Sequence, residues 1–126
     1  MCTSRQLYSI THDMVQEYRR VYGSAVEKIL LYGSYARNEQ DNESDVDIVA
    51  IVHGERNDLQ ELLKQVWEYS TDIGMENDVV ISPSVIPYSE YEKYKRILPY
   101  YMNIEKEGIE PVSYTHLRAH ETVLDL

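Results

Sequence analysis

The sequence has little of several features that mark other classes of protein. It contains one cysteine, Cys2, which excludes an internal disulfide and suits a reducing compartment. No apolar stretch approaches the roughly 18 residues of a membrane helix, and the start of the chain has no apolar segment of signal-peptide length. No cysteine and histidine spacing typical of zinc sites occurs. We therefore expect a cytoplasmic protein that has no membrane contact and no zinc.

Basic residues are also scarce. Twelve Lys and Arg stand against 22 Asp and Glu, giving a net charge of −10, and the basic residues are scattered along the chain. Proteins that bind nucleic acid use clustered Lys and Arg against the phosphate backbone. Direct nucleic-acid binding is therefore not expected.

Phenylalanine is absent, whereas twelve tyrosines are present. Tyrosine then has to supply the aromatic part of the core and its boundary. A second interpretation is that some exposed tyrosines form a surface for a partner protein. The composition leaves both interpretations open.

The 126 residues are enough for one domain with a modest core, and we expect that domain to span residues 1–110. Apolar spacing and turn residues predict an α/β (α+β) domain, with a small mixed β-sheet flanked by helices. Three helices are predicted: 7–22, ended by Gly23; 58–73, opened by a capping box and ended by Gly74; and one opened by a capping box at Ser89 and stopped by Pro99. A last short element of unspecified type is expected at 100–107, broken by Gly108. The predicted strands are 26–32, 46–52 and 78–82, the last ended by Pro83.

A sharp turn follows the first predicted strand. The apolar run 29–32 stops at Gly33-Ser34, and a short helix from Ser34 to Glu39 is expected next. Such a turn presents bare backbone N–H groups, the Ser34 hydroxyl and the positive end of the helix dipole, all of which favour a phosphate group. Arg37 is the cation of that helix and is a candidate contact for a triphosphate.

Two acids open the second predicted strand. Asp45 and Asp47 are two residues apart, and alternate strand residues point to the same face, about 6.6 Å apart along the chain. Two close carboxylates repel unless a cation lies between them, and oxygen ligands suit a hard divalent metal. A phosphate-binding turn that faces a metal-binding pair is what nucleotidyl transfer requires.

Gly33-Ser34, ten intervening residues and then Asp45-Val46-Asp47 together resemble the signature of the DNA polymerase beta-like nucleotidyltransferase superfamily. More narrowly, the chain is similar to the minimal nucleotidyltransferases, single small domains that in bacteria often pair with a helical HEPN-domain ribonuclease toxin. The resemblance runs from about residue 26 to residue 108. Members usually carry glycine where this chain has Asn38, a residue that tolerates the left-handed conformation better than most.

The resemblance implies a nucleotidyltransferase fold and two magnesium ions that bridge Asp45 and Asp47 to a nucleoside triphosphate. It implies transfer of AMP from ATP to a hydroxyl, in the antitoxin branch a tyrosine of the partner HEPN toxin. Superfamily enzymes usually carry a third acid on the next core strand, which points to Asp78 as general base or metal ligand. The chain is too small for an acceptor-binding domain, so a partner or a second copy in a homo-oligomer has to supply that binding.

Two other functions remain open at this stage. The first is a binding module that neutralises its toxin by contact or senses nucleotide without turnover, and the second is a transferase for a small molecule. The stretch from Pro111 to Leu126 continues no pattern and looks like translated read-through of sequencing-adapter DNA, so we expect it to be peripheral. The sequence leaves the nucleotide base and the acceptor undecided.

Overall fold

The computed structural model describes residues 4–33 and 45–108. The elements in chain order are α1 (Ser4–Tyr22), the 3-10 helix η1 (Gly23–Ala25), β1 (Val26–Tyr32), β2 (Val46–Val52), α2 (Arg56–Asn77), β3 (Ile81–Pro87), α3 (Tyr88–Tyr94) and α4 (Pro99–Glu107). Predictions for Ser34, Arg37 and Asn38, for the short helix 34–39 and for the stretch 111–126 lie outside the described residues.

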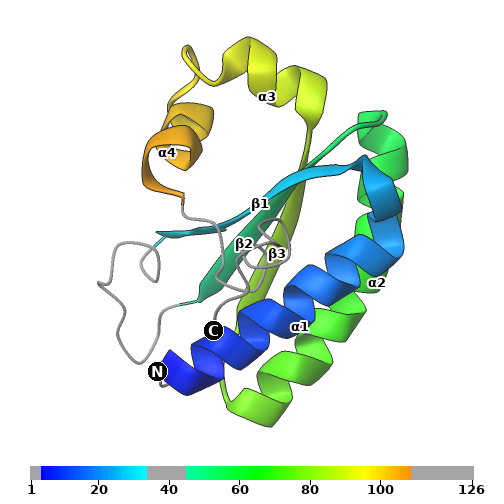
Figure 1. Ribbon diagram of the computed structural model, residues 1–126, viewed down its shortest axis with the longest axis vertical. Helices are drawn as coiled ribbons and strands as arrows, with labels where there is room; N and C mark the ends of the chain where they lie inside the picture. The colour runs from blue at the N-terminus through cyan, green and yellow to red at the C-terminus, as the bar shows by residue number, and fades with distance from the viewer. Residues whose placement is uncertain (1–3, 34–44, 109–126) are drawn as a thin grey trace, which may run out of the picture.

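The three strands form one mixed sheet in the order β1-β2-β3 (Figure 1). β1 is antiparallel to β2, whereas β2 is parallel to β3. Six of the seven β2 residues are buried, which follows from a central strand that is covered on both faces. The predicted α/β class with a small mixed sheet is therefore confirmed.

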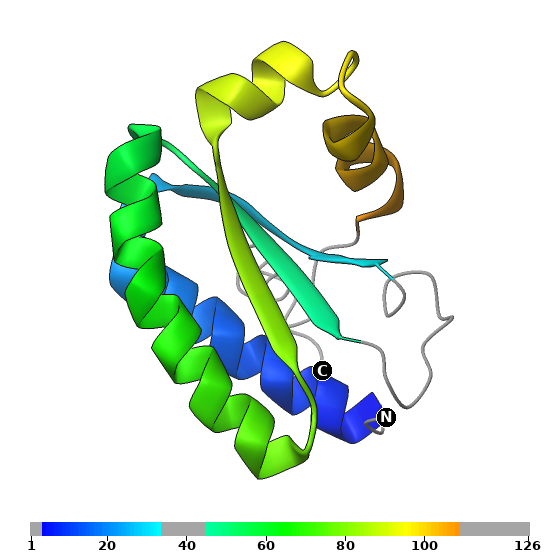
Figure 2. The same ribbon diagram turned by 180° about the vertical axis from the view of Figure 1, so that it is seen from behind.

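Helices cover both faces of the sheet. α1 and α2 lie side by side on one face, while α3 and α4 lie on the other, as both views show (Figures 1 and 2). The core is accordingly divided between two buried clusters. The α1–α2 side includes Ile10, Met14, Tyr18, Val46, Ile48, Ala50, Val52, Leu63 and Val66, and the α3–α4 side includes Leu30, Val49, Ile51, Ile86, Tyr91 and Ile104. None of the helices in the described ranges has the length and apolarity needed to cross a membrane.

The tyrosine-rich composition does supply aromatic core, as expected. Tyr18 and Tyr91 are among the largest fully buried side chains of the described residues. The Tyr18 hydroxyl accepts a hydrogen bond from the Ser84 amide at 3.1 Å and lies 2.8 Å from the Ile48 carbonyl, to which it can donate. It thereby fastens α1 to both β2 and β3. Burial raises the pKa of Tyr18 well above its ordinary value, so the phenol stays protonated and able to donate.

The first half of the chain follows the sequence prediction closely. β1 and β2 have the predicted bounds, and α1 ends at Tyr22 before Gly23, whose φ of +61° is in the left-handed region. The predicted capping boxes are wrong. α2 begins after Glu55 and α3 begins after Pro87, and neither helix has a side-chain cap at its N-terminus. Pro99 begins α4 instead of only stopping the preceding helix.

The prediction that Gly74 ends a helix is wrong. α2 continues to Asn77, and Asp78 follows with the left-handed φ of +57°. A Cβ on Gly74 would lie 2.6 Å from the carbonyl oxygen of Val79. The glycine therefore serves the close return of the chain toward β3, and not helix termination.

The third strand begins later than predicted, and Pro83 lies inside it. The Val46 amide donates to the Val80 carbonyl at 2.8 Å, so even-numbered residues of this parallel pair direct their backbone groups toward β2. Pro83 and Pro87 are odd-numbered, which puts their nitrogens on the outer side of an edge strand. A proline costs no ladder hydrogen bond there, which is why it does not end the strand.

Candidate active site

Asp47 is the middle member of a row that crosses the sheet. It pairs with Tyr32 of β1 and with Ser82 of β3, and directly paired residues point to the same face. Two residues further along β2, Val49 belongs to the cluster under α3 and α4. The row therefore lies on the α3–α4 face, at the end of the sheet where β2 and β3 begin.

Gly33 comes directly after this row and lies against Asp47. It is buried, with a φ of +84° that L-residues rarely adopt. A Cβ placed on it would lie 2.5 Å from Oδ2 of Asp47. Only glycine lets the backbone pass this close to the carboxylate, so the predicted approach of the Gly33 turn to one of the acids is present in the fold.

Asp45 lies at the outer rim of the same end of the sheet. It precedes β2, is exposed, and receives a hydrogen bond of 3.4 Å from the Ser82 hydroxyl to its Oδ2 atom. Ser82 thus stands opposite one acid and contacts the other. The sequence analysis did not single out Ser82, because its position depends on the true register of β3.

Asp78 does not join this pair in the way predicted. It ends α2 and is exposed, so its expected position at the entrance of a core strand is wrong. Within residues 4–33 and 45–108, no group of three or more His, Cys, Asp or Glu side chains is arranged to hold a metal ion. The described part of the chain therefore offers a carboxylate pair at this sheet end, and not a triad.

The donor set still fits magnesium. Mg²⁺ binds oxygen ligands and commonly uses one or two protein carboxylates, completing its shell with water and substrate phosphates. Asp45 is open to solvent and Asp47 is half-buried beside it. Such a pair suits an ion that arrives together with a nucleoside triphosphate.

A pocket of about 210 Å³ adjoins Asp47 on the α4 side. Tyr100 of α4 forms one wall and contacts Tyr32 edge to face, with ring centroids 6.0 Å apart. Burial is the main cause that raises the pKa of Tyr100, while a hydrogen bond from Ser84 lowers it. The remaining lining residues are Ile48, Val49, Ser82, Pro83 and Ser84. Tyr100 was not predicted from the sequence, because only the docking of α4 on the sheet brings it here.

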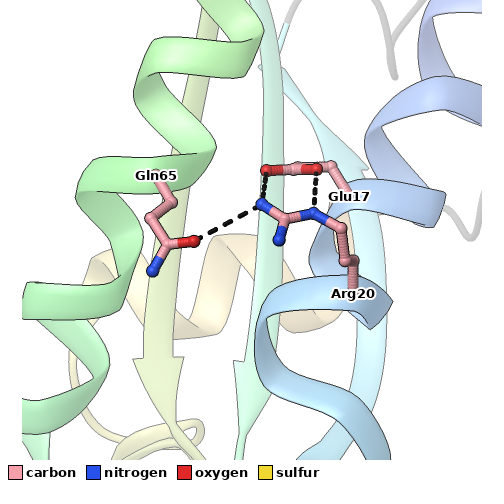
Figure 3. Close-up of polar contacts among 3 residues, drawn as sticks. All are labelled: Glu17, Arg20 and Gln65. Carbon is pink, nitrogen blue, oxygen red and sulfur yellow. Dashed lines mark hydrogen bonds and ion pairs between the residues drawn. The ribbon is translucent and has the colours of Figure 1, made fainter.

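A second hollow, of about 670 Å³, lies between α1 and α2, in the helix layer on the opposite face of the sheet. Arg20 lines this hollow. It donates to both carboxylate oxygens of Glu17 at 2.9 and 2.7 Å and to Gln65 at 3.4 Å (Figure 3). The hydrogen bonds to Glu17 and the charge of Glu17 raise the pKa of Arg20. The contacts join the two helices, and their residues belong to a different layer from Asp47.

Comparison with known proteins gives a family for this geometry. The family model "Polymerase beta, Nucleotidyltransferase" matches residues 14–89, more than half of the chain. Two relatives come from Methanocaldococcus jannaschii. "Putative protein adenylyltransferase MJ0435" is 39% identical over 62 residues, which cover 49% of this chain and 66% of the relative; "Putative protein adenylyltransferase MJ0141" is 27% identical over 82 residues, 64% of this chain and 79% of the relative.

Solved structures also align with the chain. One described as a toxin-antitoxin with AMP-PNP has 16% identity and a TM-score of 0.47, covering 87% of this chain and 91% of that one. A mutant of the MntA-HpeT toxin-antitoxin has 14% identity and the same TM-score, with the same coverage. Likenesses of this size establish neither an activity nor a partner.

Proposed function

Because the chain belongs to the polymerase beta nucleotidyltransferase family, we propose that it transfers AMP from magnesium-bound ATP to a hydroxyl group of a protein. The observation that carries the proposal is the close approach of Gly33 to the Asp47 carboxylate at one end of the sheet, so close that a Cβ on Gly33 would lie 2.5 Å from Oδ2. A phosphate-binding turn and a metal-binding acid are useful to a nucleotidyltransferase only when they lie this close together.

Each residue of the site has a proposed role. Asp45 and Asp47 hold magnesium, and the Gly33 turn, with Ser34 and Arg37, binds the triphosphate. Magnesium, when bound, neutralises the charge of the phosphates and of the leaving pyrophosphate. The acceptor hydroxyl gives its proton to water, its oxygen forms a bond to the α-phosphorus of ATP, and the bond from that phosphorus to pyrophosphate breaks. Asp78, which follows α2, is given no role here, because no group of three acids in the described part of the chain is arranged to hold a metal ion.

The choice of a protein as acceptor is supported by the printed names of the two M. jannaschii relatives, both of which are protein adenylyltransferases by name. The resemblance to minimal nucleotidyltransferases refines it to a tyrosine of a partner HEPN-domain protein. The gene next to this one tests the refinement: it should encode a helical protein with the Arg and His ribonuclease motif of that class.

A labelling assay tests the transfer. The protein is incubated with magnesium, ATP labelled in its α-phosphate and the product of the neighbouring gene, and label is measured on that product. Asp45→Asn and Asp47→Asn remove the negative charges that hold magnesium, so each should lower labelling by at least about a hundredfold, the size of effect expected for electrostatic catalytic groups. Asp58→Asn is the matched control, because this exposed acid lies on α2, and it should label as the unchanged protein does.

The assay also separates the alternatives. Binding to the neighbour without transfer of label would favour a contact-only binding module and would overturn the enzymatic proposal. Label transferred to a small hydroxyl compound, in the absence of any protein acceptor, would favour a small-molecule transferase.

A further inference from the structure

We propose that the pocket beside Asp47 binds the base of the nucleotide, and that the ring of Tyr100 is the surface on which the base stacks. The inference rests on the proposed function, because it requires the triphosphate to be held at Asp47. It assigns a binding role to α4, an element that the site residues predicted from the sequence do not include.

The position of the pocket is the first reason. Asp47 lines it directly, and Tyr32 and Ser82 of the same cross-sheet row line it on either side. From that row the pocket extends along the sheet toward Ser84 and α4. A nucleotide with its phosphates at the end of the sheet can therefore place its base in the pocket without leaving this face.

The chemistry of the lining is the second reason. Among the described residues that line the pocket, Asp47 is the one with a formal charge, and there is no lysine or arginine. Such a lining disfavours a phosphate and suits an uncharged planar group. The Ser82 and Ser84 hydroxyls can hydrogen-bond to the edge of a base, and the tyrosine rings provide aromatic surface.

The state of the Tyr100 ring is the third reason. The side chain is 48% exposed, although it is held by neighbouring rings. Tyr32 meets it at 6.0 Å and an interplanar angle of 76°, and Tyr101 lies 5.6 Å away. A ring that is already fixed by its neighbours loses little conformational entropy when a base stacks on it.

The alternative occupant is an aromatic ring of the acceptor. The geometry favours the base, because the acceptor hydroxyl has to approach from solvent, and the solvent-facing rim of the site is at exposed Asp45. The pocket instead lies further along the sheet, where Tyr100 of α4 forms one of its walls.

Calorimetry of the full chain with two probes tests the inference. Magnesium-ATP carries a base, whereas magnesium tripolyphosphate carries the phosphates alone. Tyr100→Ala should weaken binding of ATP by roughly 5- to 150-fold, the range of a lost base–aromatic stack, and should leave tripolyphosphate binding unchanged. Tyr100→Phe keeps the ring and should bind ATP nearly as the unchanged protein does. Tyr8→Ala is the control, because Tyr8 is an exposed tyrosine on α1, in the other layer.

Tyr100→Leu guards against a simple loss of folding, since leucine keeps apolar bulk at this position without a ring. It should lose ATP affinity as alanine does while its urea unfolding midpoint stays near that of the unchanged protein. Equal weakening of both probes, or of neither, overturns the inference. In the labelling assay, a Tyr100→Ala variant that raised only the KM for the acceptor would also overturn the inference, and would assign the pocket to the acceptor. Failure of the proposed function looks different, because the unchanged protein would then transfer no label to an acceptor, whatever its affinity for the two probes.

Discussion

Replacing Gly33 by alanine separates the folding role of this residue from its role in the site. Gly33 and Gly23 both have left-handed φ angles, +84° and +61°. An L-residue in that region costs about 1–2 kcal/mol, so Gly33→Ala and Gly23→Ala should each lower the free energy of unfolding by about that amount. Gly23 is the matched control, because a Cβ there meets no atom within 4 Å.

The two variants should differ in nucleotide binding. A Cβ at Gly33 would lie 2.5 Å from Oδ2 of Asp47 and 3.4 Å from its Cγ, so the carboxylate has to turn away. Because the conflict involves the end of a side chain, the turn adds little to the loss of stability. It does remove one charged ligand, and an interaction of that kind is worth about 1.5–3 kcal/mol, or roughly 10- to 150-fold in affinity for magnesium-ATP.

Urea titration gives the stability of both variants, and calorimetry with magnesium-ATP gives the affinity. The reasoning fails if Gly33→Ala binds magnesium-ATP within about twofold of Gly23→Ala at equal stability. It also fails if the unchanged protein binds the nucleotide and Gly23→Ala loses as much affinity as Gly33→Ala.

Three further variants test the packing and the charges. Tyr18→Phe should lower the free energy of unfolding by about 1–3 kcal/mol in urea titration, because it removes the buried hydroxyl that bonds to the Ile48 carbonyl and the Ser84 amide. Gly74→Ala should destabilise, although alanine in a helix interior is normally favoured by about 1 kcal/mol, because its Cβ would meet the Val79 carbonyl at 2.6 Å. Glu90→Gln should flatten the loss of stability below about pH 5. The hydrogen bond from Arg56 lowers the pKa of Glu90 from its ordinary value, so this carboxylate stabilises the fold at neutral pH and loses that effect as the pH falls through its folded pKa.

For each of these variants, one result would contradict the explanation given. Tyr8→Phe, at an exposed tyrosine, should leave the urea midpoint unchanged, so an equal loss there would remove the explanation given for Tyr18. A more stable Gly74→Ala would mean that the helix end relaxes without cost. If Glu90→Gln does not alter the loss of stability at low pH, other carboxylates cause that loss.

Local patterns were sufficient for the first half of the domain. The apolar runs 29–32 and 48–52 indicated β1 and β2, and the second run is nearly continuous because β2 is the central strand and is covered on both faces. Gly23 was recognisable as a helix end for an equally local reason, because glycine readily adopts the left-handed conformation that it has there. The Gly33 turn and the Asp45 and Asp47 pair were found through their spacing and a family resemblance. The match to the family model supports that resemblance.

Predictions from local patterns failed where the role of a residue depends on the tertiary structure around it. Gly74 looked like a terminator, yet it is small because the Val79 carbonyl passes over it. Pro83 looked like a strand end, yet an edge strand tolerates proline when its nitrogen faces outward. Both errors moved the predicted third strand toward Asp78, which the structure places at the end of α2 and outside β3.

The sequence by itself determined the class of the domain, its first two strands and the carboxylate pair, because these depend on short-range periodicity and on residue chemistry. The tertiary structure alone decided which groups stand beside that pair. The parallel register of β3 puts Ser82 opposite Asp47, and the docking of α4 brings Tyr100 from 53 positions further along the chain into the same pocket. Register and docking are set by the packing of whole faces, so no window of neighbouring residues contains them.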